Sequence, residues 1–149
     1  MAESTFKIRE RTIILYGPVN SIFQSLGAIL LEQGADVAFL YKDASRSHRF
    51  ISSLMDMRQV HGHYGRAATV DCDIQSPADA KDAISRTAEL FGSADIYIDG
   101  CFQTRDLTSN NDPTKLMAQE CVEFFLGRGK GRFIYFQHDD SICTHNTSK

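Results

Sequence analysis

The chain has 149 residues, 42% of them hydrophobic and 23% charged, which suits a single domain with a buried core and excludes the disordered class. A formal net charge of -3 gives no basic field for nucleic acid or an anionic membrane, and no apolar run reaches the ~20 residues of a membrane span. The polar start lacks the apolar core of a signal peptide, and four cysteines without CxxC spacing are typical of free thiols. We therefore expect a cytoplasmic protein with no nucleic-acid or membrane partner.

Strand and helix patterns alternate in the first part of the chain. An apolar strand, Thr12–Tyr16, precedes a helix over about 21–33, and a second strand, Asp36–Tyr41, precedes a helix that Ser45 can cap. The helical spacing of apolar residues predicts that the first helix faces the core through Ile22, Leu26, Ile29 and Leu30.

The same alternation continues to the end of the chain. The strand Ala67–Asp71 is followed by a helix from Pro77, capped by Ser76 and ended by Gly92, and then by a strand over 95–98. The last helix begins at Pro113, and a final strand over 132–136 leads into a polar tail, residues 137–149. The apolar side of the last helix carries Leu116, Met117, Cys121, Phe124 and Phe125.

This alternation predicts an α/β fold: a three-layer, Rossmann-like, doubly wound parallel sheet of about five strands in the order 3-2-1-4-5. Residues 1–149 form one domain with a core at 11–136. The first strand, glycine turn and helix have the frame of a dinucleotide-binding unit, in which three glycines have separate roles. At the spacing G-x-x-x-G-x-G only Gly17 is a glycine, because Ser21 and Phe23 occupy the other two positions. We expect the Phe23 ring to fill the space that a pyrophosphate would otherwise take.

Several strings resemble the short-chain dehydrogenase/reductases over about residues 10–102, and more loosely at the last strand. GADVAFLYKD and GPVNSI are similar to the enoyl-acyl-carrier-protein reductase branch, and VDCDIQSPADAKDAISRTAELFGSADIYIDG is similar to the family's third strand, helix and fourth strand. The resemblance implies that Asp73 matches the aspartate that contacts adenine. A vestigial NAD or NADP site would then comprise Gly17, Ser21, Phe23, Lys42, Asp73 and Asp99.

The chain departs from the family at the residues that carry catalysis. Asp99-Gly100-Cys101-Phe102 stands where the family has Asn-Asn-Ala-Gly, which would place a carboxylate beside the cofactor's ribose. Gln137 and His138 follow the last strand, where the family has its serine, and His145-x-x-x-Lys149 is the closest string to the family's Tyr-x-x-x-Lys pair. The resemblance therefore implies a truncated, degenerate member without catalytic residues.

Three further groups of residues have two interpretations each. The tail residues His138, Asp139, Asp140, Cys143 and His145 could ligate a metal, but a solvated tail is favoured and no metal is predicted. The run GRGKGR at 127–132 could hold an anion, although glycine and basic residues are also the ordinary end of a helix. Arg46, His48 and Arg49 could read a ribose phosphate or simply be surface charges.

Two functions follow from these patterns. The favoured hypothesis is a non-catalytic scaffold that acts through protein–protein interaction or self-association, with no cofactor. Its interface would be the exposed edge of the last strand and the neighbouring helix, which predicts a homodimer or another protein partner through Phe133, Ile134, Tyr135, Phe136, Phe124 and Phe125. The alternative is a nucleotide- or NAD(P)-binding module, or a reductase, with a modified cofactor site.

Overall fold

The described residues form five β-strands and four α-helices in strict alternation. The structure is a computed structural model that describes residues 7–17, 21–41, 48–60, 62–99 and 113–135. In chain order the elements are β1 (Thr12–Tyr16), α1 (Ser21–Glu32), β2 (Asp36–Tyr41), α2 (His48–Val60), β3 (Ala67–Asp71), α3 (Pro77–Phe91), β4 (Ile96–Asp99), α4 (Pro113–Arg128) and β5 (Arg132–Tyr135).

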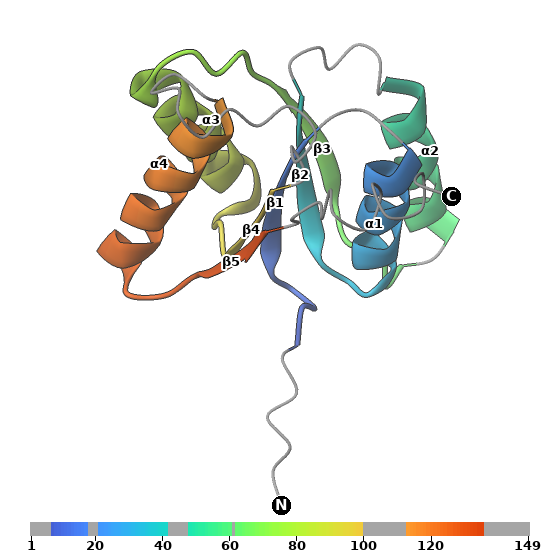
Figure 1. Ribbon diagram of the computed structural model, residues 1–149. Helices are drawn as coiled ribbons and strands as arrows, with labels where there is room; N and C mark the ends of the chain where they lie inside the picture. The colour runs from blue at the N-terminus through green and yellow to red at the C-terminus, as the bar shows by residue number, and fades with distance from the viewer. Residues whose placement is uncertain (1–6, 18–20, 42–47, 61, 100–112, 136–149) are drawn as a thin grey trace, which may run out of the picture.

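The strands form one parallel sheet in the order β3-β2-β1-β4-β5. Helices α1 and α2 cover one face of this sheet, and α3 and α4 cover the other (Figure 1). The expected three-layer, doubly wound α/β fold and its strand order are thereby confirmed. In such sheets the order reverses beside the first strand, and ligands generally bind there, beyond the carboxyl ends of the strands.

The core has two halves, one on each face of the sheet. All of β1 is buried, as expected for a central strand that is covered on both faces. Ile14 and Tyr16 belong to the half beneath α3 and α4, whereas Ile13 and Leu15 belong to the half beneath α1 and α2. Successive residues of β1 thus face opposite helix layers. The strand itself ends at the edge where a Rossmann ligand would lie.

Helix α1 packs partly as predicted, because Leu26 and Leu30 lie against the core beneath this helix. Ile29, expected in the core, is 56% exposed, whereas Leu31 is 1% exposed. Gly27 lies four residues before Leu31 and is also buried, so these two residues define the buried side of the helix. A Cβ atom built on Gly27 would lie 2.3 Å from two ring carbons of Phe39 on β2. The glycine therefore lets α1 approach the sheet closely.

Helix α3 has the ends that the sequence predicts. The Ser76 hydroxyl accepts a hydrogen bond from the backbone N–H of Asp79, and Pro77 occupies the first turn. Gly92 closes the helix in the left-handed conformation, with a φ of 82°. The Asp79 carboxylate also accepts from the backbone N–H of Gln75, which completes a capping box in which two N–H groups are satisfied.

Helix α4 ends in a tight turn that contains the glycine-rich run. Gly129 has a φ of 70°, and its N–H donates to the carbonyl of Leu126. The N–H of Lys130 donates to the carbonyl of Phe125, which satisfies another of the last helical carbonyls. The expected structural role of this run, ending the helix before β5, is confirmed.

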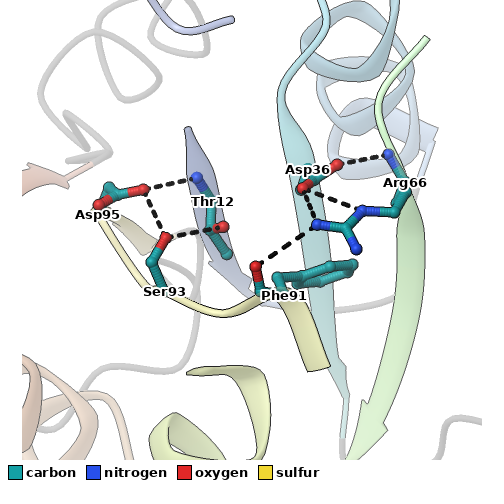
Figure 2. A network of polar contacts seen from close by, with 6 residues as sticks. All are labelled: Thr12, Asp36, Arg66, Phe91, Ser93 and Asp95. Atoms are coloured by element: carbon teal, nitrogen blue, oxygen red, sulfur yellow. Dashed lines mark hydrogen bonds and ion pairs between the residues drawn. The ribbon is translucent and has the colours of Figure 1, made fainter. Parts of the chain in front are cut away.

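Strand β4 begins one residue later than predicted because Asp95 has a different role. Its carboxylate accepts hydrogen bonds from the N–H of Thr12, at 2.8 Å, and from the Ser93 hydroxyl, at 3.0 Å. Nearby, the Asp36 carboxylate accepts from both the backbone and the guanidinium of Arg66 (Figure 2). These contacts hold the amino ends of neighbouring strands together. Asp95 joins the segment before β4 to β1, and Asp36 joins β2 to the segment before β3.

Candidate functional site

The carboxyl ends of β1 and β4 meet at the point where the strand order reverses. Gly17 directly follows β1 and is buried. In the parallel pairing of these strands Tyr16 and Asp99 are Cα partners. Of the predicted cofactor residues, Gly17 and Asp99 are therefore brought together at the usual place for a Rossmann ligand.

The sequence resemblance predicted Asp99 in a turn after β4, but the structure places it in the strand itself. It is the last residue of the strand and its exposed fraction is 0%. Burial raises the pKa of the Cys121 thiol on α4, and the charges of Asp99 and Glu120 raise it further. Asp99 thus belongs to the face of the sheet beneath α4, where the strand end contributes an acidic group to an otherwise apolar layer.

Among the remaining predicted cofactor positions, the structure describes only the side chain of Asp73. Ser21 begins α1 and Phe23 lies in its first turn, but their side chains are not among those that the structure describes. Lys42 falls outside the described residues. Asp73 follows β3, two strands from β1, where it is exposed and its carboxylate accepts a hydrogen bond from the Gln75 side chain at 2.9 Å. The expected pocket-filling role of Phe23 stays a prediction.

Gly27 is a site-forming residue that spacing alone missed. The sequence reasoning assigned the helix-packing position of the glycine motif to Phe23 and concluded that this glycine was lost. In the structure Gly27 does allow close packing of α1, one helical turn later, because a Cβ atom there would collide with the Phe39 ring and lie 3.5 Å from the Leu15 side chain. The close packing of α1 on the sheet is therefore present although the glycine spacing of the motif is not.

The predicted interface residues fall into four groups. Phe133 and Ile134 on β5 are 38% and 41% exposed. Phe125 is 8% exposed and belongs to the core, so it supports the fold and is not a surface contact. Phe124 is half-buried against that core, with the Arg128 guanidinium 5.4 Å from its ring centre. Tyr135 ends β5 with its side chain outside the description, and Phe136 lies beyond the described residues.

A surface groove adjoins the exposed part of β5. Its volume is about 660 Å³, and α4 supplies most of its lining. The Phe133 ring lies 4.9 Å from the ring of Tyr97 on β4, which places Phe133 on the α4 side of the sheet. Two further apolar side chains of α4, Val122 and Leu126, are 45% and 75% exposed. Val122 and Phe133 both line the groove, so α4 and β5 each contribute an exposed apolar side chain to it.

Other predicted positions lie where the structure gives no description. They comprise the family's catalytic equivalents and the candidate metal ligands, namely Gln137, His138, Asp139, Asp140, Cys143, His145 and Lys149. Arg49 is exposed in the first turn of α2. In the described part of the chain, no helix is long and apolar enough to cross a membrane.

Solved structures with this fold are short-chain dehydrogenase/reductases. A short-chain type dehydrogenase/reductase from Mycobacterium marinum superposes with a TM-score of 0.68 at 17% identity, over 87% of this chain and 56% of that one. A hydroxysteroid dehydrogenase from Escherichia coli gives 0.66 at 15% identity, over 87% and 56%. An NADH-dependent reductase responsible for alginate metabolism gives 0.63 at 17% identity, over 86% and 58%.

These similarities confirm the Rossmann fold of the short-chain dehydrogenase/reductases that the sequence resemblance predicted. The chain spans little more than half the length of the structures that it matches. No family model and no curated protein matches the sequence. At such low identity the likeness defines the fold, and the function must be argued from the residues themselves.

Proposed function

We propose that this chain is a non-catalytic Rossmann scaffold that acts by self-association through β5 and the exposed face of α4. The observation that carries the proposal is the apolar surface at one edge of the sheet. Phe133 and Ile134 on β5, with Val122 and Leu126 on α4, are each at least 38% exposed. Large apolar side chains gathered at an edge usually mark a surface that a protein partner covers.

The two sides of β5 are exposed for different reasons. Phe133 points toward α4, where the helix and Tyr97 cover part of its ring. Ile134 is the next residue, and successive strand residues point to opposite faces, so Ile134 lies on the face covered elsewhere by α1 and α2. A partner strand beside β5 would cover apolar atoms on both faces and continue the sheet. A two-fold pairing of β5 with its copy is the simplest closed arrangement.

The non-catalytic part of the proposal is supported by the cofactor edge. A carboxyl group, Asp99, ends β4 beside the end of β1, where a Rossmann fold binds the phosphates of its cofactor. An ionised carboxylate there opposes those phosphates.

A nucleotide-binding module is the second candidate function. Gly17 is buried at the end of β1, and Gly27 keeps α1 close to the sheet, so the frame of a dinucleotide site is present. Among the similar structures, the NADH-dependent reductase has also been solved in complex with NAD. This candidate requires that the cofactor tolerate Asp99 at the strand end.

Light scattering on the purified chain and two matched variants tests the proposal. We expect a dimer for the natural sequence and a folded monomer for Ile134→Lys. Pairing of the edge would bury the lysine charge without a partner, which opposes dimer formation. Ile29→Lys on α1 is the control, since Ile29 is 56% exposed on a helix away from β5 and should leave the dimer intact. A natural chain that stays monomeric at high concentration, or an Ile134→Lys variant that still dimerises, contradicts self-association through this edge.

A further inference from the structure

A cation-lined hollow lies at the amino edge of the sheet, at the opposite ends of the strands from the cofactor edge. Its volume is about 370 Å³. The lining comes from the segments that lead into β1, β4 and β5, namely Arg11, Asp95, Ile96, Lys130, Gly131 and Arg132. Three of these six residues are cationic and one is acidic, in a chain whose net charge is -3.

The fold holds the backbone of these cationic residues in place. The N–H of Arg132 donates to the carbonyl of Asp95 at 3.0 Å, and the carbonyl of Arg11 accepts from the N–H of Asp36 at 2.9 Å. A Cβ atom on Gly131 would lie 2.1 Å from the Phe125 ring, so the turn passes directly over this core residue. The contact of Gly131 with Phe125 thus holds the turn against the core, and Lys130 and Arg132 are the residues on either side of Gly131.

The single acid of the hollow is already engaged by neighbouring groups. One carboxylate oxygen of Asp95 accepts from the N–H of Thr12 and the hydroxyl of Ser93 (Figure 2). Its other oxygen lies 3.7 Å from a guanidinium nitrogen of Arg128, which is not part of the lining. Arg128 thus offsets the charge of Asp95 from outside the lining, and the lining itself carries three cationic residues.

We propose that this hollow binds the phosphate group of a small phosphorylated molecule. Two guanidinium groups can each present parallel N–H donors to phosphate oxygens, and an ammonium group adds a third charge-assisted donor. The hollow is larger than a phosphate ion alone, which leaves room for an attached group. Such a site would take its ligand at the start of β5, far from the carboxyl edge of the sheet.

Calorimetric titration with inorganic phosphate and pyrophosphate, at an ionic strength held constant with chloride, tests this assignment. We expect both anions to bind, pyrophosphate more tightly, and the variants Lys130→Gln and Arg132→Gln to weaken binding about tenfold. Lys81→Gln on α3 and Arg49→Gln on α2 are the matched controls, exposed on helices outside the hollow, and should bind as the natural chain does.

A gain-of-affinity variant separates binding from a merely structural role. Asp95→Asn keeps an oxygen that can accept from Thr12 but removes the negative charge, so phosphate should bind more tightly to it. Amide chemical shifts on phosphate addition should change at Ile96, Gly131 and Arg132. The proposal is overturned if neither anion binds, if Lys130→Gln binds as well as the natural chain, or if the shifted amides lie elsewhere.

Discussion

Tyr16 and Asp99 are Cα partners at the carboxyl ends of the adjacent parallel strands β1 and β4, and both side chains are buried. This pair stands at the reversal of strand order, where a dinucleotide would bind in an active relative of this fold. A tyrosine and a carboxyl group therefore end the two strands that lead to this edge. In the proposed non-catalytic scaffold, a charged carboxyl group here would oppose the phosphates of a dinucleotide.

Gly27 is predicted to be indispensable for the packing of α1. In Gly27→Ala the new methyl group would lie 2.3 Å from the Phe39 ring, so helix or ring must move, at a cost of about 1–3 kcal/mol. This loss should exceed the gain of about 1 kcal/mol that alanine brings to a helix. Urea denaturation would measure the difference.

Gly127 supplies the matched control for that substitution. It is exposed in α4, and a Cβ atom there meets nothing within 4 Å, so Gly127→Ala should stabilise the protein. Phe39→Leu should relieve part of the loss when combined with Gly27→Ala, because it removes the ring carbons in question. Equal effects of alanine at both glycines would show that α1 does not pack as described.

The capping box of α3 predicts a specific acid sensitivity. Hydrogen bonds from the backbone of Gln75 and then from Ser76 lower the pKa of Asp79. A lowered pKa in the folded state means that the stabilising contribution is complete above the ordinary carboxyl pKa and is lost as the pH falls through the lowered value. Asp79→Asn should therefore show a smaller loss of stability on acidification, measured by thermal denaturation across that range. An unchanged pH profile would contradict the role of Asp79.

Ser76→Ala tests the other half of the same box. Removing the hydroxyl leaves the N–H of Asp79 without its acceptor, and such cap substitutions typically cost about 1 kcal/mol. Ser85→Ala, on the exposed middle of α3, is the control. The cap is not stabilising if both substitutions have the same effect in chemical denaturation.

Cys72 and Cys121 are expected to resist alkylation in the folded protein. Their exposed fractions are 6% and 0%, and burial raises the pKa of Cys72 to about 12 and raises that of Cys121 as well. Since the thiolate is the reactive form, iodoacetamide should modify them only when the chain opens. Peptide mapping by mass spectrometry, with and without denaturant, checks this. Rapid modification of either thiol in the native protein would mean that its environment is open.

The order of elements could be predicted from the sequence because local signals define it. Apolar runs such as Thr12–Tyr16 indicate buried parallel strands, and Ser76, Pro77 and Gly92 mark the ends of α3 through their own backbone preferences. Interactions between distant segments could not be read in this way. The burial of Asp99 depends on α4, and the role of Gly27 depends on Phe39, which a different strand supplies.

The buried face of α1 shows the same limit on a smaller scale. Helical spacing correctly predicted that Leu26 and Leu30 pack against the core, but it also predicted Ile29 there, whereas the helix turns Gly27 and Leu31 toward the sheet. The close approach at the glycine determines this rotation, because a larger residue at position 27 would collide with the strand beneath. A periodic apolar pattern identifies a helix and indicates roughly which side of it is buried. The exact rotation of the helix depends on the residues against which it packs.

Restoring the glycine motif should give the chain measurable affinity for a dinucleotide if the proposed function is right. A variant with Ser21→Gly, Phe23→Gly and Asp99→Asn would let the backbone approach a pyrophosphate and remove the opposing charge. We expect it to gain measurable NADH fluorescence enhancement relative to the natural chain. The same variant without Asp99→Asn separates the steric part from the electrostatic part. If neither variant binds, obstacles other than these three residues close the site.

Calorimetric titration of the natural chain with NADH and NADPH tests most directly the claim that the cofactor edge has lost its ligand. The account predicts no saturable heat for either dinucleotide, because a carboxyl group and a broken glycine motif occupy the phosphate-binding edge. Saturable binding of NADH or NADPH with a micromolar dissociation constant would contradict it and would favour the nucleotide-binding alternative.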